Sequence, residues 1–375
     1  MSGIYIHIPF CKKACNYCDF HFATSVRLKP QMVEAIIQEI NLRTAYLQGE
    51  KVETIYFGGG TPSLLSEEEL NAILYTVYQN FEVDPKAEIT LEANPDDINK
   101  SHLEQWVKAG VNRLSIGIQS FKDEHLKWMN RAHNSEEALQ CVQLANESGI
   151  HNISIDLIYG LPQLTPKQWQ ENIQAAIELG VPHISAYCLT IEPNTNFGYQ
   201  FKKGQLKPID DEVAVEQFEV LMDELQNAGF DHYEISNFGK AGFYSKHNTS
   251  YWLDKPYLGV GPSAHSFNGK TRSWNIANNK KYVLGVESNE LMTEEENLTI
   301  SEQYNDYILT KLRTIWGVNT DEIQSKFGDT IAKYFEKNIQ KQINNKLITL
   351  NSNNNFVLTQ SGKFVADRVC MELFQ

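Results

Sequence analysis

Long apolar segments are missing from this 375-residue sequence. No run reaches the roughly 18 apolar residues that a membrane-spanning helix needs. The opening residues, MSGIYIHIPF, also lack the basic start and the long apolar stretch of a secretion signal. We therefore expect a soluble, cytoplasmic protein that contacts a membrane only through a partner.

A basic excess is missing as well. The chain has 33 Lys and Arg against 47 Asp and Glu, which gives a formal net charge of -14. Such a charge repels phosphate backbones and anionic lipids unless a local basic patch overrides it. We expect no nucleic-acid partner. Hydrophobic residues make up 42% of the chain, which is enough for one large core and a second, smaller one.

Cysteine is scarce, and six cysteines in so long a chain exclude a disulfide scaffold. Three of them, Cys11, Cys15 and Cys18, lie within eight residues. In a reducing compartment this spacing favours metal binding. The other three stand singly in apolar stretches and are predicted to be small core residues: Cys141, Cys188 and Cys370.

Short β-rich runs alternate with helix-like segments from Gly3 to Gly229. The six predicted strands are Ile4 to Ile8, Thr54 to Phe57, Glu88 to Glu92, Arg113 to Ile118, Asn152 to Leu157 and His183 to Leu189. Capping boxes predict three helix starts, at Ser66 with Glu69, Ser101 with Glu104 and Thr165 with Gln168. The sequence therefore predicts an α/β fold, a partial (β/α)6 TIM-like barrel spanning residues 1–230.

The pattern changes after residue 230. We expect a loop-rich connecting segment over residues 231–297, with a further domain over 298–375. In that domain helices precede a hairpin, LITLNSNNNFVLT, and a last helix runs from Ser361 to Leu373, which resembles a winged helix. Residues 290–375 hold nine Lys or Arg against twelve Asp or Glu, so a structural or partner-docking role is favoured over DNA binding.

The three clustered cysteines follow the first predicted strand. A structural zinc site normally takes four ligands in two spaced pairs, and isolated buried thiols would need no such spacing. Three thiolates suit a [4Fe-4S] cluster with one open iron, where the amine and carboxylate of an amino acid can chelate. The segment IYIHIPFCKKACNYCDF resembles the opening of the radical SAM superfamily. Within that superfamily, the residues of this segment are similar to those of the anaerobic coproporphyrinogen III oxidase family, which includes HemW heme chaperones.

This resemblance implies a [4Fe-4S] cluster on Cys11, Cys15 and Cys18, with S-adenosylmethionine (SAM) on the open iron. The matching family positions imply eight further residues around SAM or a second SAM: Tyr5, Gly59, Gly60, Thr61, Glu92, Gln119, Arg131 and Asp156. Each has an ordinary alternative, as a strand aromatic, a glycine turn, or a solvated or turn-capping polar residue. Together they fall after successive strands, where a parallel sheet gathers its ligands.

Two features separate the sequence from the coproporphyrinogen III dehydrogenases, the members of the family that decarboxylate their substrate. Those members have a further cysteine at the position of Phe20 and a longer segment before the first cluster cysteine, whereas ten residues precede Cys11 here. Both features resemble HemW. The run HNTSYW also resembles a motif associated with heme binding, which implies heme contact by His247, Asn248, Tyr251 and Trp252. Packing is the alternative for these side chains.

Two functions remain open at this point. The resemblance favours a heme chaperone that passes heme to an acceptor protein, with an electron donor for the cluster. The alternative is an oxygen-independent coproporphyrinogen III dehydrogenase, a radical enzyme of porphyrin biosynthesis. Phe20 and HNTSYW favour the chaperone.

Overall fold

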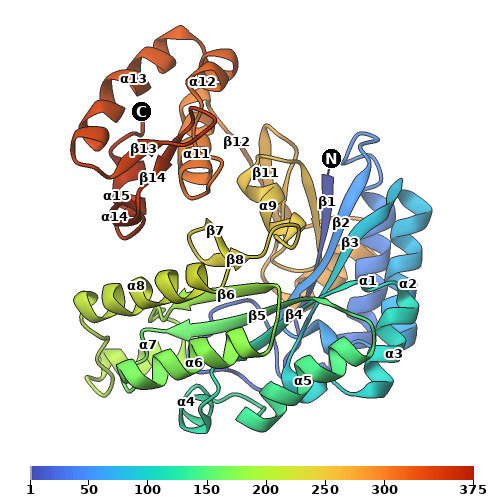
Figure 1. Cartoon of the computed structure of the whole chain (residues 1–375). Helices are drawn as coiled ribbons and strands as arrows, with labels where there is room; N and C mark the ends of the chain where they lie inside the picture. Colours follow the sequence, from blue (N-terminus) through green and yellow to red (C-terminus); the bar gives the residue numbers. More distant parts are fainter. Residues whose placement is uncertain (1) are drawn as a thin grey trace.

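A curved sheet of twelve strands forms the centre of the larger lobe in the computed structural model, which describes residues 2–375 (Figure 1). The strands of this sheet are β1 (Ser2–Ile8), β2 (Val52–Gly59), β3 (Val83–Ala93), β4 (Arg113–Gln119), β5 (Asn152–Tyr159), β6 (His183–Cys188), β7 (Asp231–Glu234), β8 (Asn237–Gly239), β9 (Tyr257–Val260), β10 (His265–Phe267), β11 (Thr271–Asn275) and β12 (Thr293–Asn297). The helices of the lobe are α1 (Lys29–Leu42), α2 (Glu67–Asn80), α3 (Lys100–Ala109), α4 (Asp123–Trp128), α5 (Ser135–Glu147), α6 (Pro166–Glu178), α7 (Asn196–Lys202), α8 (Asp211–Asn227), α9 (Lys246–Trp252) and α10 (Asn279–Glu287).

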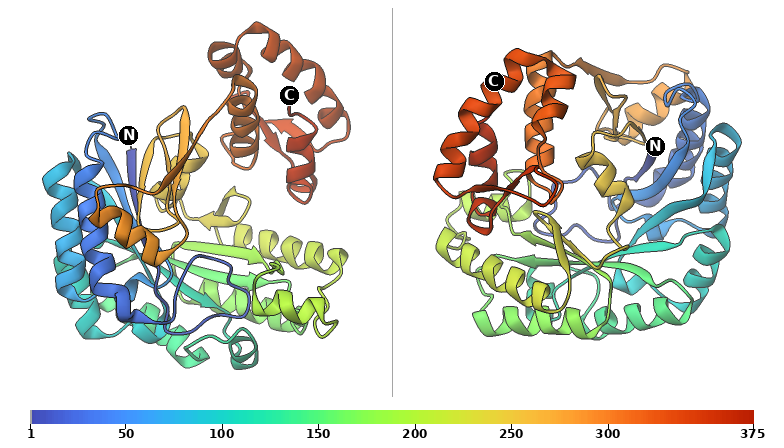
Figure 2. Two further views of the ribbon diagram at one scale, coloured as in Figure 1. Left: turned by 180° about the vertical axis from the view of Figure 1, so that it is seen from behind. Right: turned by 45° about the horizontal axis from the view of Figure 1, so that its top comes forward.

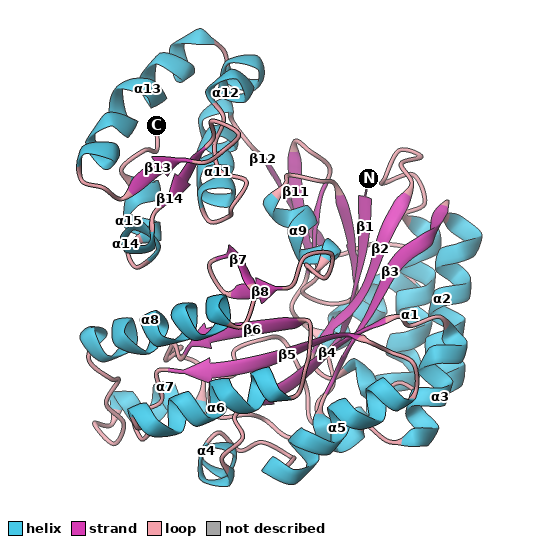
Figure 3. Ribbon diagram, viewed as in Figure 1, coloured by secondary structure: helices cyan, strands magenta, loops and turns pink. Residues whose placement is uncertain are grey.

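The first six strands pair in parallel and in chain order, so all six predicted strands are confirmed. Helices cover the outer face of this sheet, and the strands curve around an interior (Figures 2 and 3). The capping boxes at Ser66 and Thr165 are confirmed. The one at Ser101 is wrong, because Asn99 caps α3 and accepts the amide N–H of His102.

Polar and apolar residues alternate along the six parallel strands. The apolar set packs against the helices, as Ile4, Ile55 and Ile116 do. The other set faces the barrel interior and is largely polar: Tyr5, His7, Thr54, Tyr56, Glu88, Thr90, Glu92, Arg113, Ser115, Gln119, Ser154, Asp156, His183 and Ser185. Successive residues of a strand point to opposite faces, so this alternation gives the barrel an apolar exterior and a polar interior.

Residues 231–297 are more ordered than the prediction of a loop-rich segment. They add strands to both edges of the sheet: β8 and β7 lie beyond β6, and β9 to β12 lie beyond β1. β9 pairs in parallel with β1, and β10 to β12 continue as an antiparallel meander. Each of these strands has only three to five residues, too short for a recognisable pattern.

The C-terminal lobe has its own apolar core, as the composition predicted. Its elements are α11 (Ile300–Leu312), α12 (Thr320–Phe327), α13 (Asp329–Asn344), β13 (Ile348–Leu350), β14 (Phe356–Leu358), α14 (Gln360–Lys363) and α15 (Ala366–Met371). β13 and β14 form the expected antiparallel hairpin. The prediction of one last helix from Ser361 to Leu373 is wrong, because this segment forms two short helices, α14 and α15. Within residues 2–375, no helix has the length and apolar character of a membrane span.

Glu39 of α1 anchors the strands added beyond β1. Its carboxylate is fully buried and accepts hydrogen bonds from Asn275 Nδ2 at 2.8 Å, the amide N–H of Gly261 at 2.8 Å and the hydroxyl of Tyr282 at 2.6 Å. Arg43 Nη1 lies 3.3 Å from Oε1 of Glu39, the oxygen that also accepts from Asn275. A buried carboxylate needs such partners.

Replacing Glu39 by alanine leaves these donors and Arg43 without their acceptor. We expect the Glu39→Ala variant to lose about 3–5 kcal/mol of unfolding free energy in a denaturant titration. Glu34 is exposed on the same helix, and Glu34→Ala should change stability by less than about 0.5 kcal/mol. Equal stability of the two variants would contradict the anchoring role.

Candidate functional site

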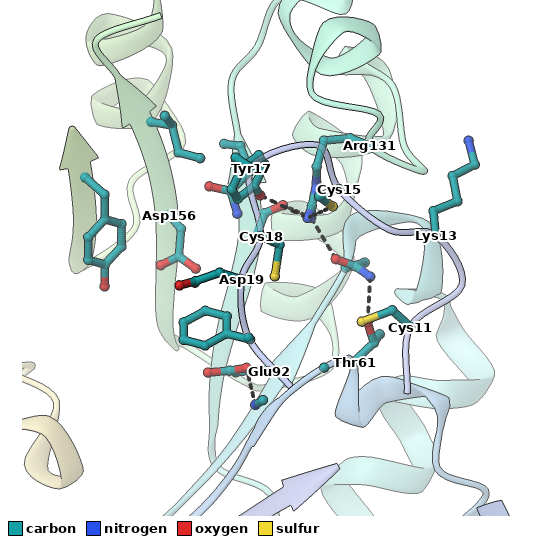
Figure 4. A pocket seen from close by; sticks show the side chains of 18 of the residues that line it. Cys11, Lys13, Cys15, Tyr17, Cys18, Asp19, Thr61, Glu92, Arg131 and Asp156 are labelled. Atoms are coloured by element: carbon teal, nitrogen blue, oxygen red, sulfur yellow. Dashed lines mark hydrogen bonds between the residues drawn. The ribbon is translucent and has the colours of Figure 1, made fainter. Parts of the chain in front are cut away.

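A cavity of about 480 Å³ opens at the carboxyl ends of the parallel strands. It brings together ten of the sequence-predicted residues: Cys11, Cys15, Cys18, Gly59, Gly60, Thr61, Glu92, Gln119, Arg131 and Asp156. Figure 4 shows the three sulfur atoms on one side and the carboxylates of Glu92 and Asp156 on the other. The rule that ligands gather at this edge of a parallel sheet therefore placed these residues together.

The three cysteines lie on the loop after β1, and their thiols are half-buried. Loss of water contact raises the pKa of Cys18 to about 12, and it raises the pKa of Cys11 against the hydrogen bond from Thr61. Among residues 2–375 no three Cys, His, Asp or Glu side chains converge on a single ion. A cubane cluster presents its irons at separate corners, so its three thiolates need not meet at one point.

Arg131 reaches the cysteine loop from beyond α4. Its Nη2 donates to Asn94 Oδ1 at 2.7 Å and to the carbonyl of Gly117 at 2.6 Å, and its Nη1 lies 3.4 Å from Cys15 Sγ. The Nε of Arg131 is buried without a partner. A fixed cation beside three thiols, with one donor unused, fits an anionic cluster and a ligand that carries a carboxylate.

Two carboxyl groups line the opposite wall. Glu92 accepts the hydroxyl of Tyr56 at 2.8 Å and the amide N–H of Gly59 at 3.2 Å. Burial raises the pKa of Glu92 to about 7 and the pKa of Asp156 to about 6. Such groups suit hydrogen bonding to the amine and hydroxyl groups that SAM offers, because a ligand donor favours their charged form.

Gly59 and Gly60, at the end of β2, pack closely against the backbone and side chains at the end of β1. Gly59 has a φ of +101°, and a Cβ there would lie 2.4 Å from the ring of His7. A Cβ on Gly60 would lie 2.7 Å from the carbonyl oxygens of Ile8 and Phe10, which lead into the cysteine loop. These glycines therefore let β2 approach β1 closely, in addition to any role toward SAM.

Gln119 ends β4 with a φ of +68°, a conformation that non-glycine residues rarely adopt. It is buried at the cavity wall. Backbone strain of this kind clusters at ligand sites.

Tyr5 faces the barrel interior and does not line the cavity; its hydroxyl is 3.1 Å from His7 Nδ1. Its place beside the cluster and SAM stays a prediction. Cys188 is exposed and lines the cavity, so its assignment to the core is wrong, whereas Cys141 and Cys370 are buried as expected. The reason is the position of Cys188 at the end of β6, where its last two residues, Tyr187 and Cys188, are both exposed. Phe20 is 68% exposed and lies at the same cavity.

The HNTSYW run forms a short helix, α9, instead of the predicted loop. Ser245 caps it by accepting the amide N–H of Asn248. The carboxylate of Glu88 accepts the amide N–H groups of Lys246 at 2.9 Å and His247 at 3.2 Å. Glu88 lies level with Thr54 and Gly3 in the sheet register, near the amino ends of the strands. Helix α9 therefore closes the end of the barrel opposite the cysteines.

His247 is 2% exposed and points into the barrel interior. Its Nδ1 lies 2.8 Å from Thr54 Oγ1, its Nε2 lies 2.7 Å from the hydroxyl of Tyr251, and its ring stacks on Tyr56 at 4.9 Å. Burial lowers the pKa of His247 to about 3, so the imidazole is neutral. The ring of His247 is enclosed and both of its nitrogens are engaged, which is what the packing alternative expects for this side chain. The predicted heme contact of His247, Asn248, Tyr251 and Trp252 stays a prediction.

Sequence reasoning missed the residues that hold α9, namely Glu88, Thr54 and Arg113. Arg113 is 1% exposed, and its Nε lies 4.0 Å from Glu88. The signal was present in the strands: Glu88, Thr90 and Glu92 stand at alternate positions between Ile89 and Leu91. Polar residues on every second position of an otherwise apolar strand indicate a polar interior face.

Comparison with known proteins agrees with this geometry. Residues 5–176 match the Radical SAM superfamily, and residues 298–365 match the HemN C-terminal domain. The chain is 35% identical to the heme chaperone HemW of Bacillus subtilis over 374 residues, which covers 98% of each chain. It is 40% identical to HemW of Escherichia coli over 268 residues, covering 70% of this chain and 69% of that one.

The chain belongs to the HemW family of radical SAM proteins. A solved structure, the coproporphyrinogen III oxidase HemN of Escherichia coli, shares the fold with a TM-score of 0.86. That match covers 100% of this chain and 90% of HemN at 23% identity. The HemW-family chain therefore has the fold of HemN, including the C-terminal domain.

The cluster assignment predicts that each of the three clustered cysteines is indispensable. Cys15→Ala should abolish the broad visible absorption of the anaerobically reconstituted protein, together with its content of about four irons per chain. Cys188→Ala is the matched control, because Cys188 lines the same cavity, and it should keep both. A full complement of iron in Cys15→Ala would rule out the assignment.

The cavity also makes a prediction for SAM. Alanine at Glu92, Gln119, Arg131 or Asp156 should weaken SAM binding to the reconstituted protein by roughly 1–3 kcal/mol, as the loss of a ligand hydrogen bond does. Isothermal titration measures this, with Gln140→Ala on the exposed face of α5 as the control. Unchanged affinity in all four variants would show that SAM does not occupy this cavity.

Proposed function

We propose that this protein is a heme chaperone, which binds heme and passes it to an acceptor protein. In this proposal Cys11, Cys15 and Cys18 hold a [4Fe-4S] cluster, and exchangeable SAM occupies the strand-end cavity. The observation that carries the proposal is the identity of 35% over 98% of a HemW heme chaperone. The acceptor is a heme protein, and the cluster takes its electron from a separate donor.

In this proposal, the three thiols of the cavity bind the cluster, and Arg131, Glu92 and Asp156 bind SAM. The three thiols face Arg131, whose unpartnered Nε can donate to a ligand carboxylate. Glu92 and Asp156 offer acceptors to amine and ribose hydroxyl groups, with Glu92 held in place by Tyr56 and Gly59. When bound, the cluster supplies an electron and an open coordination position.

Phe20 supports the chaperone over the dehydrogenase. The resemblance implies a cysteine at this position in the decarboxylating members of the family, whereas this chain has Phe20, whose side chain is 68% exposed at the cavity. A phenyl ring offers neither a thiol ligand nor a proton donor to a tetrapyrrole substrate. The shared fold with HemN does not distinguish the two functions.

Parallel assays of one anaerobically reconstituted preparation test the proposal. We expect hemin to bind at about one per chain with a shifted Soret band, as heme does on gaining an axial ligand. We expect no useful conversion of coproporphyrinogen III to protoporphyrinogen IX in the same preparation with SAM and a reductant.

HemN of Escherichia coli, purified and assayed alongside, is the positive control for conversion. Robust conversion by this protein would replace the chaperone proposal with the dehydrogenase. Failure of hemin to bind at micromolar concentration would overturn the chaperone proposal as well.

A further inference from the structure

Asn94 stands directly after β3, at the edge of the sheet where the cysteine cavity opens, and it lines that cavity. It precedes the short 3-10 helix η3 (Pro95–Asp97), a position where an asparagine side chain commonly accepts a backbone N–H of the helix that follows. Here the side chain makes no such bond. Its amide group lies instead between Arg131 and Thr61. The side chain therefore serves the cavity rather than the local backbone.

The two ends of this amide group have fixed orientations. A guanidinium group has only N–H donors, so the atom of Asn94 that lies 2.7 Å from Arg131 Nη2 is the acceptor, Oδ1. The amide nitrogen, Nδ2, then faces Thr61 Oγ1 at 3.3 Å and donates to it. Because Thr61 Oγ1 accepts this bond, the single proton of its hydroxyl group is free to point toward another acceptor.

Both neighbours of Asn94 contact a cysteine of the cavity. The Thr61 hydroxyl is hydrogen-bonded to the thiol of Cys11, and it is the donor once that thiol is a thiolate. Arg131 Nη1 lies 3.4 Å from Cys15 Sγ, while Nη2 is held by Asn94. Figure 4 shows Arg131 beside Cys15 and Thr61 beside Cys11. One side chain thus directs donors to two of the three predicted cluster ligands.

Gly117 of β4 gives the guanidinium of Arg131 its place next to Asn94. A Cβ at Gly117 would lie 3.0 Å from Arg131 Nη2 and 3.8 Å from Asn94 Oδ1. The carbonyl of Gly117 also accepts from Nη2 at 2.6 Å. The absence of a side chain at this position therefore lets the guanidinium reach both Asn94 and the cysteine loop.

The residues that follow Asn94 hold the cysteine loop itself. Asp96 accepts Lys12 Nζ at 2.7 Å, and Asp97 pairs with the same lysine. Asp97 is 3% exposed and also accepts the hydroxyl of Ser63 at 2.7 Å. The loop is therefore anchored on the segment that carries Asn94, which keeps the donors and the sulfur atoms in register.

We propose that Asn94 is a positioning residue that raises the reduction potential of the cluster. It holds Arg131 so that one N–H points to Cys15, and it holds Thr61 so that the O–H points to Cys11. A reduced cluster carries one more negative charge, and hydrogen bonds to its sulfur atoms favour that state. This inference rests on the proposed function, in which the three cysteines hold the cluster, and adds to it a residue that acts through two others.

Redox titration of the full-length, reconstituted protein without SAM tests this role, with electron paramagnetic resonance of the reduced cluster as the readout. Asn94→Ala removes both bonds, so its midpoint potential should lie at least about 59 mV below that of the wild type, which is a tenfold change for a one-electron couple. Asn172→Ala is the matched control and should keep the wild-type potential. Asn172 is fully buried, bonds to Phe121 and Ser120, and does not line the cavity.

A double-mutant cycle shows whether Asn94 acts through Thr61. Thr61→Val keeps the shape of the side chain and removes the hydroxyl, so it should lower the potential by losing the bond to Cys11. Asn94→Ala should then lower the potential less in the Thr61→Val background than in the wild type, because one of its two effects is already gone. If Asn94→Ala does not fold or load iron, Thr61→Val alone tests the bond to Cys11, and an unchanged potential there overturns the proposal.

The outcomes separate this inference from the function on which it rests. If the wild type holds no four-iron cluster, the cofactor assignment of the proposed function fails. If Asn94→Ala has the iron content and the midpoint potential of the wild type, the positioning role is wrong and the proposed function stands. An equal fall of the potential in Asn94→Ala and Asn172→Ala would also overturn the role, because the shift would then follow a loss of packing and not the hydrogen bonds to sulfur.

Discussion

The hydrogen bonds from the first turn of α9 to the carboxylate of Glu88 are the interaction on which the placement of α9 at the end of the barrel depends. This carboxylate accepts the amide N–H groups of Lys246 and His247, which have no acceptor within α9 because they lie in its first turn. A negative charge at this position also interacts favourably with the helix dipole. Glu88 thereby holds α9 across the amino ends of the strands, and it fixes the direction in which His247 enters the barrel.

From His247, contacts run through the barrel to the cysteine cavity. Its ring stacks on Tyr56 at 4.9 Å, and the Tyr56 hydroxyl donates to Glu92 at 2.8 Å. On the other side, His247 Nε2 lies 2.7 Å from the hydroxyl of Tyr251 in the same helix. Buried polar groups are costly without partners, so a side chain lost from this series leaves its neighbours unsatisfied. The structure thus joins the proposed SAM site to α9 and its HNTSYW run through packed polar side chains rather than through an apolar core.

The sequence predicted the part of the fold that has a regular period. The six parallel strands and most of their helices follow from alternation and capping, and the strand-end rule then gathers ten predicted residues at one cavity. The strands of residues 231–297 escaped prediction because they are short and β12, TEEEN, is mostly charged. Their pairing is decided by tertiary contacts such as those of Glu39. The burial of His247 was missed for a similar reason: α9 has seven residues and no apolar period, so only Glu88 and Thr54 reveal its place.

Mössbauer spectroscopy of the protein reconstituted with isotopically enriched iron tests most directly whether three cysteines hold a cluster with one open position. With Cys11, Cys15 and Cys18 as the only protein ligands, one iron in four should change its spectrum when SAM is added, while the other three keep theirs. If the spectra of all four irons stay unchanged when SAM is added, the result would contradict a three-cysteine cluster with one open iron in the cavity at the carboxyl ends of the strands.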